Sequence, residues 1–576
     1  MTSIKKKFAV LILFMTSISL MAQEDIKIKI IETSDVHGCF FPYDFINMEP
    51  MKGTLSRVFS YVQEQCIKYG DNVILLDNGD ILQGQPSCYY NNYVKPELEN
   101  VAASVVNYMG YDAQTIGNHD VETGHAVYDK WISEVNCPVL GANVIDTTTG
   151  RPYLTPYTII ERSGIRIAVI GMLTAAIPNW LHEDLWSGLR FENMVTSAKK
   201  WVKIVQEAEH PDLIVGLFHS GKEGGIVTDE YEEDASMRVA QEVDGFDIIF
   251  YGHDHTTHKD WFYGPSGKQV LCLDPSSNAI QVAEAEVVFD SKSKTIKTIK
   301  GGLRPVVNFT PDKAFLQHFQ PVTDSVNAYV NRCIGRLKRT FYSKDCYFGN
   351  APFTDLIHDL QLSMTGADVS FNAPLTFDIC VQEGDIHVSD LFNLYRYENQ
   401  IYALKMTGRE IRDFLEMSYD LWVNTMSSPD DHIMLLQDGF SDDKQRYSFK
   451  NLAFNFDSAA GIDYEVDVTK PDGEKVHILR MSNGEPFEFD RWYLVTMNSY
   501  RGNGGGELLT KGAGIPLDEL KNRIVFRSEK DQRHYLKEWI EKRQVIDPQA
   551  HDNWRFVPES WTKPAIERDR KLIFGE

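Results

Sequence analysis

Cysteine is scarce in this chain, and its spacing forms no motif. Among 576 residues there are 8 cysteines, scattered between Cys39 and Cys380, and no pair has the spacing of a zinc-binding motif. So low a density excludes a small fold held together by disulfides. We expect most of these side chains to be small buried hydrophobes, with one or two disulfides left open.

Long apolar runs, repeats and positive charge are also in short supply. Beyond the first 22 residues no segment has the length and apolarity of a membrane helix, and no internal repeat or low-complexity run is found. Lysine and arginine total 58 against 82 acidic residues, a formal net charge of −24. A chain this acidic is a poor candidate for binding a nucleic-acid polymer.

The amino terminus has the pattern of an export signal. Three lysines at positions 5–7 precede an apolar stretch over residues 8–21, followed by Ala22 and Gln23. The apolar run is too short to span a bilayer, so it predicts a signal peptide over residues 1–22. No cysteine follows for a lipid anchor. We expect a periplasmic or secreted protein with no integral membrane segment in its mature chain.

Five short polar segments follow apolar runs within the first 255 residues. The runs at residues 26–31, 73–76, 214–217 and 248–251 are typical of buried strands. Polar residues at strand carboxyl ends meet at one edge of a sheet, where α/β proteins place their sites. The segments are Ser34-Asp35-Val36-His37-Gly38, Asn78-Gly79-Asp80, Gly117-Asn118-His119-Asp120, Phe218-His219-Ser220 and Gly252-His253-Asp254-His255.

Together these segments offer carboxylates, imidazoles and one amide. That is the ligand set by which two adjacent divalent cations are held when they activate water against a phosphate ester. One such segment alone is weak evidence, because Asp-x-His or Gly-Asn-His also occurs as an ordinary turn or helix cap. Five in this order argue against coincidence.

The order of the five segments resembles the calcineurin-like metallophosphoesterases. The resemblance implies two divalent metal ions, and mixed nitrogen and oxygen ligation suits Mn, Zn, Fe or Co alike. It implies a four-layer αββα sandwich in the amino-terminal domain. It assigns Asp35, His37 and His255 to one ion and Asn118, His219 and His253 to the other, with Asp80 bridging both.

His119 follows a proposed ligand and can point at the departing oxygen, where an imidazole would stabilise or protonate the leaving group. The nucleotidase branch of the family pairs this histidine with an aspartate three residues later. Here Glu122 takes that place and is one methylene longer. The resemblance implies a catalytic His119–Glu122 pair. The alternative, in which Asp120 and Glu122 only complement the N-terminus of a helix, stays open.

A change of pattern near residue 306 predicts a connection between two domains. Residues 312–337 carry apolar side chains at helical spacing: Phe315, Phe319, Val322, Val326 and Val330. A chain of this length also needs more than one core. We expect an α/β two-domain protein with a signal peptide at 1–22, a metallophosphoesterase catalytic domain at 23–305, a linker helix at 306–342, a C-terminal α/β nucleotide-binding domain at 343–545 and a tail at 546–576.

Two segments of the second half place aromatic residues among turn-formers, at residues 371–399 and 498–506. Such rings suit a nucleobase, since stacking on each is worth about 1–3 kcal/mol. In the alternative interpretation Tyr395 and Tyr397 alternate on a strand, one of them in the core. Tyr500 adjoins a glycine-rich turn, so we expect it to be exposed.

These segments resemble the C-terminal domain of the 5′-nucleotidase family, and more narrowly its 2′,3′-cyclic-nucleotide 2′-phosphodiesterase/3′-nucleotidase branch. The likeness continues through Leu415-Glu416-Met417-Ser418 to the terminal Asp552-Asn553-Trp554-Arg555. It implies a nucleotide substrate whose base lies between Tyr397 and Tyr500, with Asn372 close by.

Two departures from the 5′-nucleotidases bear on the substrate. Phe377 replaces an arginine that grips phosphate there, a contact that an aromatic ring cannot supply, and Gly506 replaces an acid. The sequence therefore predicts a secreted dinuclear-metal hydrolase of 2′,3′-cyclic nucleotides and 3′-nucleotides. A 5′-nucleotidase or nucleotide-sugar hydrolase is the alternative, and a non-catalytic nucleotide-binding protein is the alternative from a different class.

Overall fold

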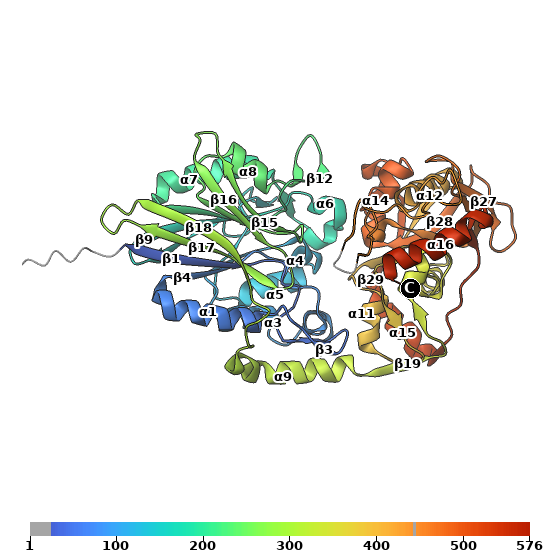
Figure 1. Cartoon of the computed structure of the whole chain (residues 1–576), viewed down its shortest axis with the longest axis horizontal. Coiled ribbons are helices and arrows are strands. Elements are labelled where there is room, and N and C mark those ends of the chain that lie inside the picture. The colour runs from blue at the N-terminus through green and yellow to red at the C-terminus, as the bar shows by residue number, and fades with distance from the viewer. Residues whose placement is uncertain (1–24, 442–444, 576) are drawn as a thin grey trace, which may run out of the picture.

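A computed structural model describes residues 25–441 and 445–575, which form two α/β domains joined by one long helix (Figure 1). The signal peptide predicted for residues 1–22 lies outside this part of the chain. Within the described residues no helix is both long and apolar enough to cross a membrane. The eight cysteines all lie within it and are unpaired, and only four of them, Cys39, Cys88, Cys272 and Cys346, are buried, which is half rather than the expected majority.

Two six-stranded sheets form the centre of the amino-terminal domain. The first has the order β18 (Ile296–Pro305), β17 (Gln281–Phe289), β1 (Ile26–Thr33), β4 (Val73–Asp77), β5 (Ala113–Thr115) and β6 (Val139–Leu140). The second has the order β15 (Thr257–Tyr263), β16 (Gln269–Pro275), β14 (Ile248–Tyr251), β11 (Leu213–His219), β9 (Ile165–Leu173) and β8 (Tyr157–Arg162).

Helices cover the outer face of each sheet, which makes the predicted αββα sandwich. On the first sheet lie α1 (Leu55–Tyr69), α3 (Val101–Met109) and α5 (His125–Glu134), and on the second α7 (Met194–Glu209) and α8 (Ser236–Glu242) (Figure 1). Alternate residues of β1 enter different cores: Ile28 and Ile30 pack between the sheets, and Ile31 packs toward the helices. Burial on both faces explains why these strands are continuous apolar runs.

The four predicted strands are confirmed as β1, β4, β11 and β14. The pairs β1–β4, β4–β5 and β11–β14 are parallel, so their carboxyl ends lie on the same side of each sheet. The polar segments follow β1, β4 and β5 in one sheet and β11 and β14 in the other. The prediction of a single sheet edge was therefore incomplete, because the segments meet where the ends of two stacked sheets face each other.

The connection between the domains is α9 (Lys313–Val330), which buries Phe315, Phe319, Val326 and Val330. The predicted helix is confirmed but ends earlier than residue 337. Residues after 332 instead form β19 (Cys333–Leu337), which pairs with β23 (Gly384–His387) and β30 (Val545–Ile546). Two apolar side chains of this strand, Ile334 and Leu337, enter the core of the C-terminal domain.

The C-terminal domain is built on a five-stranded sheet of order β25 (Ser458–Ala460), β21 (Val369–Asn372), β28 (Trp492–Asn498), β24 (Gln400–Thr407) and β29 (Ile524–Asp531). Its helices include α10 (Pro352–Thr365), α12 (Gly408–Trp422) and α15 (Gln532–Arg543). A three-stranded sheet of order β27 (Val476–Met481), β26 (Ile462–Asp467) and β31 (Trp554–Val557) stands beside it.

The segment 546–576, predicted as a tail, is part of this domain instead. β31 pairs in parallel with β26, and α16 (Glu559–Phe574) adds Ile573 and Phe574 to the core. Trp554 and Phe556 alternate with exposed Arg555, which is the pattern of a half-buried strand. The domain therefore continues almost to the end of the chain.

Candidate active site

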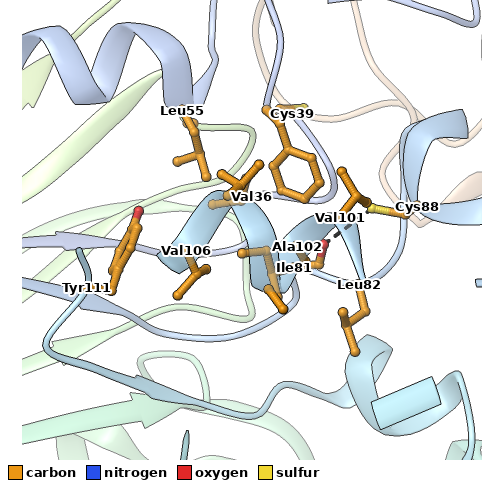
Figure 2. Close-up of a cluster of buried hydrophobic side chains, with 14 of the residues drawn as sticks. Val36, Cys39, Leu55, Ile81, Leu82, Cys88, Val101, Ala102, Val106 and Tyr111 are labelled. Atoms are coloured by element: carbon orange, nitrogen blue, oxygen red, sulfur yellow. Dashed lines mark hydrogen bonds between the residues drawn. The ribbon is translucent and has the colours of Figure 1, made fainter. Parts of the chain in front are cut away.

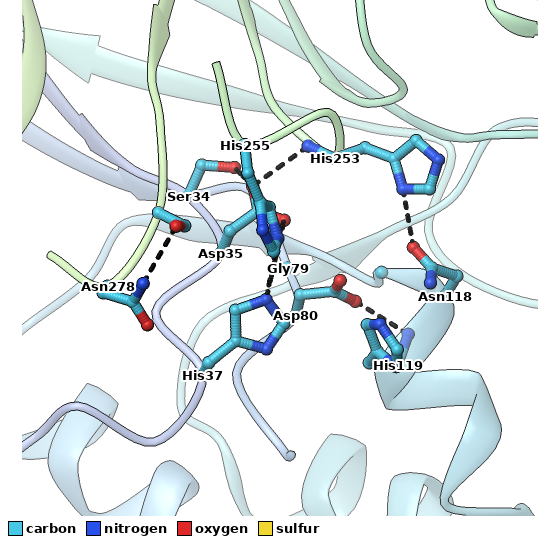
Figure 3. A network of polar contacts seen from close by, with 12 residues as sticks. Ser34, Asp35, His37, Gly79, Asp80, Asn118, His119, His253, His255 and Asn278 are labelled. Atoms are coloured by element: carbon cyan, nitrogen blue, oxygen red, sulfur yellow. Dashed lines mark hydrogen bonds and ion pairs between the residues drawn. The ribbon is translucent and has the colours of Figure 1, made fainter. Parts of the chain in front are cut away.

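Side chains at the carboxyl ends of five central strands converge, and Figure 3 shows those that follow β1, β4, β5 and β14. In the first group, Asp35 Oδ1 lies 3.3 Å from His255 Nε2 and 4.0 Å from His37 Nε2. The ring nitrogens of those two histidines are 3.0 Å apart. Three ligand atoms thus face a common point, as the sequence predicted.

The second group surrounds the side-chain oxygen of Asn118. This oxygen lies 3.0 Å from His219 Nε2 and 2.8 Å from His253 Nδ1. Asp80 Oδ2 is 3.3 Å from His219 Nε2, and its ligand atoms group with those of both His219 and Asp35. Asp80 therefore lies between the two groups, and the structure brings all seven predicted ligands together.

These seven side chains offer ligand atoms that fit two divalent cations. Asp35 is fully buried, one of its carboxylate oxygens accepts from His253 N at 3.0 Å, and the other, Oδ1, faces only the Nε2 atoms of His255 and His37, at 3.3 and 4.0 Å. A cation between that buried oxygen and the two ring nitrogens would satisfy all three ligand atoms. Carboxylate, imidazole and amide ligands together suit Mn, Zn, Fe or Co.

Five of the seven residues have a left-handed backbone. The φ angles are 50° at Asp35, 48° at His37, 54° at Asp80, 82° at His253 and 56° at His255. Residues other than glycine adopt this region rarely, at a cost of about 1–3 kcal/mol each, and such residues gather at functional sites. The backbone is thus held in costly conformations that aim these side chains at one another.

Two glycines let the loops approach the carboxylates. A Cβ added at Gly252 would overlap Ser34 Oγ and Asp35 Oδ2, and one added at Gly117 would overlap Asp80 Oδ1. Apolar neighbours fix the same loops from below, because Val36, Ile81 and Leu82 are buried in the core under the site (Figure 2). Ligand and anchor residues therefore alternate along the loops after β1 and β4.

The charges of the site favour the metal-binding forms of Asp35, Asp80 and His37, but they raise the pKa of His219 and of His253. Burial alone would raise the pKa of Asp80, but the imidazoles of His219 and His119 hold it well below its usual range. Burial lowers the pKa of His37 to about 3, so this ring is neutral. His219 differs, since Asp80 and Asp35 overcome its burial and raise its pKa to about 10. A cation binding there displaces a proton.

His119 and Glu122 form the predicted pair. His119 Nδ1 is 2.6 Å from Glu122 Oε2, so the longer acid reaches the ring. Burial lowers the pKa of His119, but Asp80 and the hydrogen bond to Glu122 outweigh it and raise the pKa to about 9. The imidazole is therefore protonated at neutral pH and can serve as an acid.

Asp120 has a structural role that the sequence did not indicate. Its carboxylate accepts from four backbone N–H groups, those of Gly117 (2.8 Å), Asp80 (2.8 Å), Ile81 (2.9 Å) and Leu82 (2.8 Å). It thereby ties the loop after β4 to the start of α4 (Asn118–Glu122). Asp120 does cap that helix, but it also fixes Asp80, while Glu122 faces His119.

A cavity of about 780 Å³ adjoins the ligand cluster, with both domains contributing to its wall. The amino-terminal domain supplies Asn118, His119, Glu122, Trp180, His253 and His255, and the C-terminal domain supplies Tyr397, Phe454 and Tyr500 among others. The volume is in the range of small-molecule sites. Sequence reasoning missed Trp180, at the end of the short helix α6 (Ile177–Trp180), and assigned no role to Phe454, although Phe454 lies in a segment that carries the family resemblance.

The two proposed base-stacking tyrosines both line this cavity. Tyr500 is half-buried rather than exposed as predicted, because Phe454 packs edge-on against it with ring centroids 6.1 Å apart. Tyr395 is the core residue of its segment, at 1% exposure, while Tyr397 faces the cavity. The alternative interpretation was thus correct that one of the two tyrosines is in the core, although neither lies on a strand.

Three other positions do not reach the cavity. Asn372 is buried at the end of β21 and does not line it, so its predicted proximity to the substrate is not seen. Phe377 packs against Phe574, with ring centroids 4.9 Å apart, and is also absent from the wall. Gly506 adjoins Asn455 and Arg501, which leave no room for a side chain. The substrate argument from Phe377 and Gly506 therefore finds no support in this geometry.

Replacing Asp120 with asparagine tests the anchoring of the Asp80 loop. An amide has one accepting oxygen, so two of the four backbone donors lose their acceptor, at about 1–3 kcal/mol each. We expect D120N to lower the free energy of unfolding of the amino-terminal domain by about 2–5 kcal/mol, measured by urea denaturation. The control is D229N on an exposed loop, expected within about 0.5 kcal/mol of wild type. Equal stability of the two variants would contradict the anchoring role.

Comparison with known proteins agrees with this architecture. Residues 28–257 match the family model of the calcineurin-like phosphoesterases, and residues 331–511 match that of the 5′-nucleotidase C-terminal domain. The chain is 26% identical to a 2′,3′-cyclic-nucleotide 2′-phosphodiesterase/3′-nucleotidase of Haemophilus influenzae, over 93% of this chain and 88% of that protein. It is 25% identical to the trifunctional nucleotide phosphoesterase protein YfkN of Bacillus subtilis, over 95% of this chain but only 40% of YfkN.

Solved structures confirm the predicted fold class. A putative 5′-nucleotidase from Staphylococcus aureus superposes with a TM-score of 0.75 at 21% identity, covering 92% of this chain and 99% of that one. A 5′-nucleotidase precursor from Thermus thermophilus gives a TM-score of 0.64 at 20% identity, covering 92% and 100%. The two family matches, in the order seen in the fold, identify the chain as a calcineurin-like phosphoesterase with a 5′-nucleotidase C-terminal domain.

Proposed function

We propose that this protein is an exported dinuclear-metal phosphoesterase that hydrolyses 2′,3′-cyclic nucleotides to 3′-nucleotides, and 3′-nucleotides to nucleoside and phosphate. One observation carries the proposal: the ligand cluster opens, through Asn118, His253 and His255, into the cavity that Tyr397 and Tyr500 line. A phosphate at the cluster and a base between the tyrosines would then occupy one continuous space.

The proposed ligand assignment follows the two groups of side chains. Asp35, His37 and His255 would hold one cation, Asn118, His219 and His253 the other, and Asp80 would bridge them. Two such cations, whether Mn, Zn, Fe or Co, would supply a water of lowered pKa and neutralise the charge of the phosphate. The convergence of Asp35 Oδ1 with the ring nitrogens of His37 and His255 supports this assignment over a binding protein that holds no metal.

Nε2 of His119 would protonate the departing oxygen. For a 2′,3′-cyclic substrate that oxygen is the ribose 2′-oxygen. The backbone N–H of His119 donates to Asp80 Oδ1 at 2.8 Å, which holds the ring beside the bridging carboxylate. Glu122 would keep the proton on Nδ1 and stabilise the charged imidazole. The base would stack on Tyr397 and Tyr500, at about 1–3 kcal/mol per ring.

The choice between 3′- and 5′-nucleotides as substrates rests on the named relatives. Phe377 and Gly506, which differ from the residues of 5′-nucleotidases, do not line the cavity and cannot decide it. Similar proteins named as 2′,3′-cyclic-nucleotide 2′-phosphodiesterase/3′-nucleotidases from Haemophilus influenzae and Salmonella typhimurium align over 88% and 89% of their own lengths. We also propose that the catalytic domain spans residues 23–305 and that the nucleotide-binding domain extends from β19 to α16.

Phosphate release from 3′-AMP and 5′-AMP tests the function directly. With added Mn we expect faster hydrolysis of 3′-AMP than of 5′-AMP, and no release from either after treatment with a chelator. Restoring Mn should restore activity. Faster hydrolysis of 5′-AMP would favour the 5′-nucleotidase alternative, and no chelator-sensitive release would contradict the enzyme assignment.

The His119–Glu122 pair predicts a specific pH dependence. We expect H119A to lower kcat on 3′-AMP by about 10²–10⁴-fold. Glu122 stabilises the protonated imidazole, so E122Q should lower the pKa of His119 and move the alkaline limb of the kcat profile to lower pH. A substrate with a 4-nitrophenolate leaving group needs little protonation and serves as control. An unshifted alkaline limb in E122Q would contradict the assigned role.

Export is proposed from residues 1–22 alone. A basic start, a short apolar run and small residues before Gln23 are features of a cleaved secretory signal. Amino-terminal sequencing of protein recovered from outside the cytoplasm of the producing cells should find a start at or near Gln23. Recovery of uncleaved chain from the cytoplasm alone would contradict export.

A further inference from the structure

We propose that Glu233 is a positioning residue for the second cation, fixing the tautomer and orientation of His253. The inference rests on the proposed dinuclear site. Glu233 lies on β13 (Glu232–Asp234), which pairs with β12 (Gly224–Val227) in a hairpin after β11. Nothing in the sequence motifs pointed to this hairpin.

The two ring nitrogens of His253 face different oxygen atoms. Nε2 is 3.1 Å from Glu233 Oε1, and Nδ1 is 2.8 Å from Asn118 Oδ1. A carboxylate oxygen accepts, so Nε2 carries a hydrogen, and in the neutral ring the lone pair is then on Nδ1. That lone pair then faces Asn118 Oδ1, and two acceptors facing each other require a cation or a proton between them.

His219 shows the same arrangement with its nitrogens exchanged. Its Nδ1 lies 2.7 Å from the backbone oxygen of Asn78, which leaves Nε2 to face Asn118 Oδ1 at 3.0 Å. Both histidines of the second group therefore have their outer nitrogen occupied by an oxygen acceptor. Such outer partners fix the tautomer and ring orientation of metal-binding histidines.

The hairpin holds the Glu233 carboxylate between its own backbone and His253. Oε2 accepts from Ile226 N at 2.7 Å, while Oε1 faces the imidazole. The backbone oxygen of Glu233 accepts from Ser220 Oγ at 2.7 Å and from Thr174 Oγ1 at 2.9 Å. A Cβ added at Gly225 would lie 2.6 Å from the carboxylate, so the glycine leaves space for it.

Other contacts restrict the His253 ring without replacing Glu233. Trp180 packs over one face, with ring centroids 5.6 Å apart and planes 34° from parallel. Asp234 lies 3.9 Å from Nε2, beyond hydrogen-bond distance, and instead accepts from Gly221 N at 2.8 Å. Glu233 is thus the hydrogen-bond acceptor that decides which ring nitrogen of His253 faces Asn118 Oδ1 and the proposed second cation.

Equilibrium Mn binding to metal-free protein, followed by calorimetry and by metal analysis, tests the proposal with a readout independent of turnover. We expect two Mn per wild-type chain. E233A should weaken one of them by about 10–100-fold and leave the other unchanged. E233Q keeps an accepting oxygen and should recover part of that loss. E230A, at the exposed tip of the same hairpin, should bind both ions as wild type does.

Three outcomes would overturn the role of Glu233. Unchanged affinities in both E233A and E233Q, or an equal loss at both sites, would show that the residue does not act on His253 in particular. Loss of a third bound Mn in E233A would make Glu233 a ligand rather than a positioning residue. If the wild-type chain binds no Mn, the proposed dinuclear site itself fails, which is distinct from a failure confined to the variants.

Discussion

Two carboxylates, Asp35 and Asp80, are buried close together at the ends of two parallel strands, and the rest of the site is arranged around their charge. Each is at most 1% exposed, and burying ionised groups costs several kcal/mol unless opposite charge is placed beside them. Imidazoles, backbone N–H groups and, in our account, two cations supply that compensation. A fold that buried these groups for stability alone would gain more from apolar side chains.

The architecture sustains this arrangement by anchoring the strained loops after β1 and β4 in apolar packing. Val36 lies between Asp35 and His37, and Ile81 and Leu82 follow Asp80, so the left-handed residues of these two loops adjoin buried hydrophobic side chains. Asp120 then links the loop after β4 to the loop after β5 by accepting from Asp80 N and Gly117 N. The protein's own packing and hydrogen bonds therefore help to position these ligands, which is the condition for a precise metal site.

The sequence predicted those features that depend on local pattern. Apolar runs located β1, β4, β11 and β14, and the resemblance to the calcineurin-like metallophosphoesterases named the seven converging side chains. The sequence could not decide whether Glu122 reaches His119, because one methylene alters the reach and only the turn of α4 settles it. Glu233 and Trp180 escaped notice because tertiary packing alone brings them to the site, and Phe454 lies in a segment of the family resemblance but was given no role. Residues 546–576 were misjudged because β31 is a short strand that pairs far back in the sequence with β26.

Anomalous diffraction from crystals grown with Mn would show whether the seven side chains hold two cations that share Asp80. We expect two anomalous peaks about 3.5–4 Å apart, the usual separation in dinuclear hydrolytic sites. The carboxylate of Asp80 should lie between them, with His37 and His255 at one peak and His219 and His253 at the other. A single peak, or two peaks that do not share Asp80, would rule out the proposed dinuclear site.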